Sequence, residues 1–316
     1  MATALTITTI RDLGNFEKLP KEEKTFLTKG LKNRSLFPAL PEPDEDDWLS
    51  SHSEMKQSQD SWWQRFQSFI SPVREKKKNI YLVPLGEKWT TSEVELDKTG
   101  TKESFLSLLQ RFASVFFTGF QVVVLPSVSI AKLKCKTRRH HGHKQLLIPD
   151  IYKYLQSKWP SDAFCVVGIT MMDLYPRESW NYVFGQALPS AGVGVFSFAR
   201  YDPLFHEEDR AKVVSSNTST LVLWRSCKVM AHEICHLFAL QHCVFFSCAM
   251  NGSNHLEESN NRPMFTCPIC LHKLKSRFAF NMKERYQAML EFCSSVEDEN
   301  FQGATIWLQK AIEKLS

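Results

Sequence analysis

The sequence predicts an α/β fold, built on a mixed, mostly parallel twisted sheet with a long helix packed against it. Buried strand patterns at residues 80–85 and 120–125 flank a helical pattern at residues 104–117. This order is typical of two parallel strands joined by a crossover helix. A second helical pattern at 148–159 leads to a third apolar run at 164–170, so we expect the parallel sheet to continue.

Two further strands and the long helix complete the predicted layers. Residues 182–185 are short and lie between polar or Pro-bearing segments, which indicates an edge strand, and residues 194–200 form the next strand. The helix is expected to begin near residues 217–220, which offer several N-cap side chains, and to end near Ala239.

The chain divides into two regions at residue 78. Residues 1–78 contain an acidic run and several prolines, and we expect a partly helical N-terminal extension there. One amphipathic helix of this region is expected to dock on the rest of the protein through Trp62, Trp63, Phe66, Phe69 and Ile70. Residues 79–316 form the main domain, which ends in helical patterns at 271–292 and 304–315.

The composition limits the class of protein. With 316 residues, 43% hydrophobic and 12% aromatic, the chain can bury a large core. It has no apolar run of about 18 residues, so no membrane partner is expected, and its acidic first thirty residues are unlike a secretory signal. Nine clustered cysteines favour a reducing compartment, so we expect the cytoplasm, the nucleus or both.

The net charge is mildly positive, at +5, and much of it lies in the tract 132–144. No aromatic residue interrupts this tract, so a solvated loop explains it better than a nucleic-acid surface. Its histidines, His140, His141 and His143, are not expected to hold a metal, because a flexible basic loop repels cations. We therefore expect no nucleic-acid partner; we also expect a monomer.

The most informative motif is H-E-x-x-H, in which His232 and His236 enclose Glu233. Histidines four residues apart share one helical face and can bind one metal ion. His242 can become the third ligand if the helix ends near Ala239 and the chain turns back. Three protein ligands leave an open position for water, as in catalytic zinc sites, and Glu233 can serve as the general base. The motif predicts peptide-bond hydrolysis by zinc-activated water.

Four cysteines follow at spacings typical of a structural zinc site: Cys243, Cys248, Cys267 and Cys270. Four thiolates close a tetrahedral shell and leave no position for water. Since His242 and Cys243 are adjacent, this second zinc is expected to hold the turn that delivers the third histidine. We therefore expect two zinc ions per chain, one catalytic and one structural.

The combined pattern H-E-x-x-H-x5-H-C-x4-C-x-M-x16-C-x-x-C resembles that of the archaemetzincins, a family of metzincin zinc peptidases. Met250 matches the family's Met-turn methionine, a hydrophobic floor below the catalytic zinc. The resemblance implies a metzincin-like, zincin-type catalytic domain over residues 79–316, with a zinc-knuckle and helical subdomain at its end. It also implies aminopeptidase-like or endopeptidase activity on a peptide or protein. By the same analogy, the edge strand at 182–185 would line the cleft and pair with extended substrate.

One departure from the family pattern is Ala239, where metzincins usually have glycine. Alanine in the left-handed conformation costs about 1–2 kcal/mol. This departure motivates a second hypothesis, a catalytically weak or inactive zinc protein that binds peptides or partner chains. A third hypothesis, a zinc-ribbon nucleic-acid binder, is disfavoured because binding alone needs no general base such as Glu233.

The sequence does not identify the group that stabilises the oxyanion. His255, which follows the methionine turn beside Glu257 and Glu258, could contact the substrate or serve at the surface. The same alternatives hold for Tyr175, Tyr182 and Tyr201.

Overall fold

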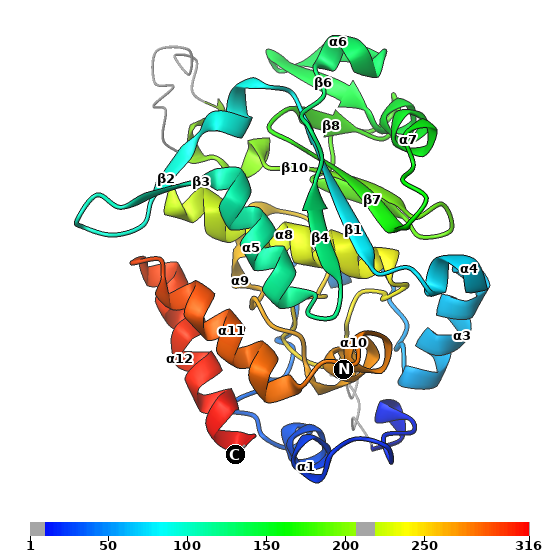
Figure 1. The fold of residues 1–316 in the computed structure, drawn as a ribbon, viewed down its shortest axis with the longest axis vertical. Coiled ribbons are helices and arrows are strands. Elements are labelled where there is room, and N and C mark those ends of the chain that lie inside the picture. The colour runs from blue at the N-terminus through cyan, green and yellow to red at the C-terminus, as the bar shows by residue number, and fades with distance from the viewer. Residues whose placement is uncertain (1–9, 207–218, 316) are drawn as a thin grey trace.

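The computed structural model describes residues 10–206 and 219–315, and a five-stranded sheet lies at its centre (Figure 1). The strand order is β4-β1-β7-β10-β9. The strands are β1 (Asn79–Leu85), β4 (Gln121–Val124), β7 (Ala163–Thr170), β9 (Gly185–Leu188) and β10 (Val193–Ser197). Neighbouring strands are parallel except for β9, which runs antiparallel to β10 at the edge. The expected α/β fold with a mixed, mostly parallel sheet is confirmed.

Helices cover both faces of this sheet. Helices α5 (Phe105–Phe116) and α8 (Thr220–Leu237) pack on one face, and α7 (Ile148–Ser157) packs on the other (Figure 1). The buried side chains accordingly form two clusters. Val167 belongs to the cluster beneath α5 and α8, and its neighbour Val166 belongs to the α7 cluster. Consecutive residues of a strand point to opposite faces, so a strand buried on both sides is apolar along its whole length.

Helix α8 is the long helix that the sequence predicts. It begins after Ser219, whose hydroxyl accepts a hydrogen bond from the Val222 amide, whereas residues 217 and 218 lie outside the described residues. It ends at Leu237, close to the expected end near Ala239. Most of its side chains are buried, because α8 lies between the sheet and the C-terminal helices (Figure 1).

The C-terminal subdomain contains three helices: α10 (Pro268–Phe278), α11 (Met282–Ser294) and α12 (Glu299–Lys314). The helical region predicted over 271–292 is divided between two helices, because Ala279 adopts a left-handed conformation at φ 52° and ends α10. The Asn281 side chain then caps α11 by accepting from the Glu284 amide. Helix α12 begins earlier than residue 304, because Asp298 serves as its N-cap.

The basic tract is not a solvated loop, as the sequence analysis expected, but a β-hairpin. Its strands are β5 (Thr137–His140) and β6 (His143–Leu147), and β6 pairs in parallel with β8 (Asp173–Tyr175). His141 and Gly142 have φ angles of 47° and 79°. Two successive residues of positive φ are typical of the tightest hairpin turns, so a short chain reversal brings the two strands together.

One side chain of this hairpin fixes a segment that leads to the sheet edge. The Arg138 guanidinium donates to the carbonyl oxygens of Glu178, Trp180 and Asn181. It also lies over the Tyr175 ring, 4.0 Å from its centroid. The Arg138 guanidinium thus satisfies three carbonyl oxygens of a segment that has no regular secondary structure.

The edge strand lies three residues later than expected, at Gly185–Leu188 rather than 182–185. Val183 instead forms an isolated bridge with Leu174, and regular pairing with β10 starts at Gly185, opposite Phe196. The strand type and its place at the edge were nevertheless predicted correctly.

The region before β1 contains α1 (Lys21–Gly30), α2 (Trp48–Ser51), α3 (Gln59–Phe69) and α4 (Pro72–Glu75). As expected for a docked amphipathic helix, α3 buries Trp62 and Phe66 completely in the larger hydrophobic cluster, but Trp63, also predicted to dock, is exposed. The boundary proposed at residue 78 falls between α4 and β1. The remaining short elements are β2 (Glu93–Glu95), β3 (Lys102–Ser104), α6 (Ile130–Leu133), α9 (Leu256–Asn261) and the 3-10 helices Ile10–Leu13, Lys88–Thr91, Ala199–Tyr201 and Pro203–His206.

None of the described helices combines the length and the apolar character that crossing a bilayer requires.

The connection between α5 and β4 provides a test of this packing. Gly119 has φ +97°, and a Cβ atom there would lie 2.3 Å from the carbonyl oxygen of Phe278. We expect Gly119→Ala to lower the free energy of unfolding by about 3 kcal/mol, through backbone strain and overpacking together. The matched control is Gly100→Ala, at φ +85° with nothing within 4 Å, which tests the strain alone. Equal losses of stability in denaturant unfolding would show that the contact with Phe278 is not tight.

Candidate metal centre

Helix α8 holds the first two histidines with their rings facing each other. Each ring donates its Nδ1 hydrogen to a backbone carbonyl oxygen, His232 to Ala249 at 2.9 Å and His236 to Leu240 at 2.7 Å. Because Nδ1 carries the proton in both rings, both Nε2 atoms carry lone pairs, and these atoms lie 3.0 Å apart. Two lone pairs at this distance repel each other unless a cation lies against both. The pair therefore fits a metal ion.

The protonation state of these rings also suits metal binding. Burial, with the neighbouring His242, lowers the pKa of His236 to about 3. Burial and the nearby Arg262 guanidinium hold the pKa of His232 well below its usual value. Both imidazoles are therefore neutral at neutral pH, as metal ligation requires.

A tight turn after α8 reverses the chain toward the third histidine. Ala239 has φ 64°, in the left-handed region. Its amide donates to the His236 carbonyl oxygen at 2.9 Å, and the Leu240 amide donates to the Cys235 carbonyl oxygen at 3.2 Å. These two bonds form the Schellman motif, which usually has glycine at the left-handed position. The turn forms with alanine in place.

This turn brings His242 to the other two histidines. Its ring centroid lies 5.2 Å from that of His232 and 5.0 Å from that of His236. One ligand atom from each of the three residues lies within 4.8 Å of the other two. The structure thus brings together the three predicted ligands, and three imidazoles form a donor set that suits zinc.

Two residues at this site come from the N-terminal region, and sequence reasoning missed both. The Glu54 carboxylate accepts a hydrogen bond from His242 Nδ1 at 2.7 Å, and this bond holds the pKa of Glu54 below its usual value although burial raises it. The Trp48 ring lies edge-on to His242, with centroids 4.9 Å apart. A carboxylate and a tryptophan in a polar segment carry no periodic or motif signal that could have identified them.

Glu233 lies next to the edge strand at a cleft of about 380 Å³. A Cβ atom on Gly185 would lie 3.0 Å from the Glu233 side-chain Cδ, so strand and carboxylate are in close contact. Burial raises the pKa of Glu233 to about 7, and the Arg262 charge opposes this shift. The residues that line the cleft include the three histidines and Glu233, together with Trp180, Tyr182, Phe184, Gln186 and Ala187.

The four predicted cysteines also meet. Their sulfur atoms lie within 4.8 Å of one another, and all four residues are buried and unpaired: Cys243, Cys248, Cys267 and Cys270. The Sγ atoms of Cys243 and Cys267 are 3.7 Å apart. A Zn–S bond of about 2.3 Å in a tetrahedron gives an S–S edge of about 3.8 Å, so the cluster fits zinc. The other five cysteines are free in the structure and lie outside the cluster.

The loop between the two clusters is held by one buried asparagine. The Asn251 side chain donates to the carbonyl oxygens of Cys243 and Phe246 and accepts from the Cys248 amide at 2.7 Å. Met250, the predicted Met-turn residue, is fully buried, and its carbonyl oxygen accepts from the Cys243 amide. The backbone beside the four thiols is therefore tied to the turn that supports the histidine site.

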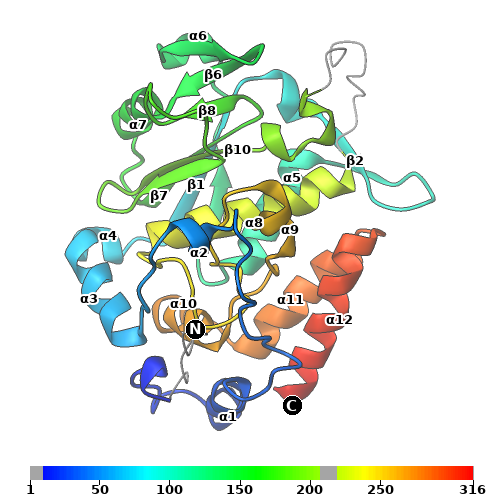
Figure 2. The ribbon, with the colours of Figure 1, turned by 180° about the vertical axis from the view of Figure 1, so that it is seen from behind.

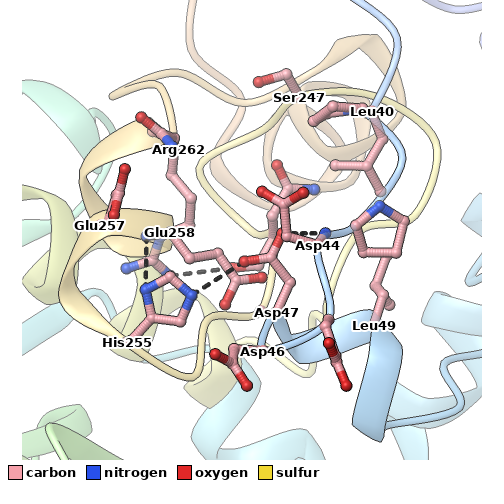
Figure 3. A pocket seen from close by; sticks show the side chains of 16 residues that line it. Leu40, Asp44, Asp46, Asp47, Leu49, Ser247, His255, Glu257, Glu258 and Arg262 are labelled. Carbon is pink, nitrogen blue, oxygen red and sulfur yellow. Dashed lines mark hydrogen bonds and ion pairs between the residues drawn. The ribbon is translucent and has the colours of Figure 1, made fainter.

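A second cavity, of about 440 Å³, is larger than the cleft but has different chemistry (Figure 3). His255 Nε2 lies 3.0 Å from an Asp47 oxygen, and His255 Nδ1 accepts from the Glu258 amide to cap α9. Glu258 accepts from the amides of Trp48 and Asn254. These groups satisfy one another, and His255 lines this second cavity and not the cleft of the three histidines.

The tyrosine candidates differ in position. Tyr182 and Tyr201 line the cleft, whereas Tyr175 packs beneath Arg138. Burial raises the pKa of Tyr201 to about 12, so its hydroxyl stays protonated. Arg262, which no sequence pattern marked as a site residue, lines the cleft and adds a positive charge there, with its Nη1 atom 3.0 Å from His232 Nδ1.

An H-E-x-x-H sequence on a buried helix of an α/β fold, with a third histidine at the same point, is typical of zinc metallopeptidases. Comparison with known proteins confirms this class. The sequence pattern of peptidase family M54 matches residues 128–276. Archaemetzincin-2 of Mus musculus is 38% identical, over 93% of this chain and 85% of its own length.

Other relatives extend the comparison. Archaemetzincin-2 of Homo sapiens is 37% identical, over 93% of this chain and 84% of its own length. Archaemetzincin-1 of Homo sapiens is 33% identical, over 87% of this chain and 57% of its own length. The crystal structure of archaemetzincin from Methanopyrus kandleri is 21% identical, with a TM-score of 0.45 over 67% of this chain and 100% of its own. The chain belongs to the archaemetzincin family, and it is a zinc metallopeptidase.

The contact between Gly185 and Glu233 yields a prediction. A Cβ atom at residue 185 would lie 2.7 Å from the Phe196 Cβ as well as against Glu233, so alanine must displace the carboxylate or the strand. We expect Gly185→Ala to reduce kcat/KM for peptide cleavage about 100-fold, the typical cost of a misplaced reacting group, with unchanged zinc content. Gly194→Ala on the neighbouring strand is the control, since its nearest neighbour is the flexible Leu237 side chain at 3.4 Å. Full activity in Gly185→Ala would contradict this assignment.

Proposed function

We propose that this chain hydrolyses peptide bonds at the three-histidine site, with His232, His236 and His242 as the ligands of a catalytic zinc ion and Glu233 as the general base. The observation that carries the proposal is the convergence of the three imidazoles beside a carboxylate on the wall of a cleft. A zinc ion held there supplies Lewis acidity, which lowers the pKa of water and polarises the scissile carbonyl.

The residues of the chain supply the remaining functions. Glu233 takes a proton from the attacking water and returns it to the leaving amine, which a carboxylate with a pKa near neutrality can do in both directions. Edge strand β9 offers its backbone along the cleft, so an extended peptide can pair with it. This pairing orients the scissile bond beside Glu233, because Gly185 of the same strand contacts that side chain.

We further propose that a second, structural zinc ion is held by the four thiols. Four deprotonated sulfur ligands close the coordination shell, so this ion contributes to folding and not to chemistry. Zinc ligation by thiols also favours a reducing compartment, which supports action in the cytoplasm, the nucleus or both.

The alternative is a zinc protein that binds peptides without cleaving them. Ala239 motivated this hypothesis, but the turn at Ala239 is formed and His242 lies with its partners. The geometry therefore favours the peptidase, and peptide cleavage by the purified protein separates the two functions.

Substitution of the general base tests the proposed mechanism. We expect Glu233→Gln to reduce kcat on a peptide library about 10²–10⁴-fold, the usual contribution of a general base, while two zinc ions stay bound. Glu257→Gln is the matched control, because it removes the same charge from an exposed residue of α9 that does not line the cleft. Equal activity of the Glu233→Gln variant and the wild type would exclude this role.

Stepwise chelation tests the two proposed metal sites. The three-histidine site is open to solvent at the cleft, whereas the four thiols are buried. We expect native mass spectrometry to show loss of one zinc ion together with activity, and loss of the second only with unfolding. Two ions released together, or one ion in the untreated protein, would contradict the assignment.

A further inference from the structure

The segment from Trp48 to Trp62, here the N-terminal brace, lies directly against the turn that carries His242. Figure 2 shows α2 and the chain on either side of it crossing α8 and α9. The brace contacts the metal centre at two places, one on the His242 ring and the other on the backbone of the turn. Both contacts join residues that are about 180 positions apart in sequence.

The first contact is made by Glu54. Its Oε1 atom accepts from His242 Nδ1 at 2.7 Å and from the Trp48 indole nitrogen at 2.8 Å. The side chains of Glu54 and His242 are only 17% and 18% exposed, so water competes weakly for this bond. Trp48 is itself fixed, because its amide donates to Glu258 and its ring packs where Gly252 has no side chain.

The second contact is made by Gln57, which is buried. Its Nε2 donates to the Ala239 carbonyl oxygen at 2.9 Å, and its Oε1 accepts from the Gln241 amide at 3.0 Å. The Trp62 indole nitrogen donates to the Phe238 carbonyl oxygen at 2.8 Å. These bonds satisfy backbone groups on both sides of the left-handed alanine, so the brace holds the strained turn in place.

We propose that Glu54 is a positioning residue for the catalytic zinc, and that Gln57 stabilises the turn that presents His242. This inference rests on the proposed role of the three histidines. A carboxylate that accepts from Nδ1 fixes the tautomer with Nε2 free, orients the ring and raises its basicity as a ligand. The other two histidines donate to the backbone carbonyls of Ala249 and Leu240, so among the three ligands only His242 donates to a side chain from the brace.

The brace also explains how alanine is tolerated at position 239. Alanine there costs about 1–2 kcal/mol relative to glycine, and the cost falls on the turn that must deliver the third ligand. The hydrogen bonds of Gln57 and Trp62 act on that turn only when it is formed. They therefore offset the strain. The N-terminal region is thus part of the metal centre and not a dispensable extension.

The test measures zinc affinity, which does not depend on turnover. Full-length wild type, Glu54→Gln and Glu54→Ala are titrated with a series of zinc chelators, and bound zinc is counted by native mass spectrometry. We expect one of the two ions to bind about 10–100-fold more weakly in Glu54→Ala, less so in the isosteric Glu54→Gln, with the second ion unchanged. The control is Glu42→Gln, an exposed carboxylate of the same region.

A spectroscopic readout separates positioning from packing. Cobalt(II) in the weaker site reports ligand geometry through its visible absorption, so the Glu54 variants should shift this spectrum and the Glu42→Gln variant should not. An unchanged affinity and spectrum in both Glu54 variants would overturn the inference. If Glu54→Ala does not fold, Glu54→Gln carries the test, because its shape is that of the native side chain.

The turn is tested by a double-mutant cycle. Gln57→Ala should weaken the same ion about tenfold, and Ala239→Gly in the same chain should restore most of the loss, because glycine removes the strain that Gln57 offsets. Gln67→Ala, on the exposed face of α3, is the control. Equal losses with alanine and glycine at 239 would contradict the role of Gln57. Failure here leaves the peptidase proposal intact, since that proposal depends on Glu233→Gln.

Discussion

The reversal of the chain after α8 is the constraint on which the metal centre depends. A helix can align His232 and His236 by itself, but a third imidazole at the same point requires the backbone to turn back within a few residues. The left-handed Ala239 and two capping hydrogen bonds make that turn. The four-thiol cluster begins one residue after His242, so both predicted metal sites share the backbone that follows the turn.

The same region shows how distant parts of the chain specify one site. The sheet supplies Gly185 against Glu233, the Met-turn supplies the Ala249 carbonyl for His232, and the N-terminal brace supplies Glu54 for His242. Each contact fixes an orientation that the motif alone leaves free. The orientation of a reacting group decides how well it works, so the residues around the motif matter as much as the ligands themselves.

The sequence was sufficient for features that are encoded locally. Apolar runs and helical periods identified the strands of the main sheet, α5, α7 and α8, and the spacing of histidines and cysteines identified both clusters. Prediction from the sequence failed where contacts between distant residues determine the local structure. The basic tract became a hairpin because β6 pairs with β8, and Ala279 ended a helix that periodicity would continue. Glu54 and Arg262 escaped notice because no short-range pattern marks a residue whose partner is far away in sequence.

The hairpin that bears the basic tract supports a segment that leads into the cleft. Through Arg138 it holds the carbonyl groups of residues 178, 180 and 181, and Trp180 and Tyr182 line the cleft. A hairpin that supplies none of the predicted metal ligands therefore holds a segment that lines the cleft. A change at Arg138 would leave these three carbonyl groups without this donor while every predicted metal ligand stays in the chain.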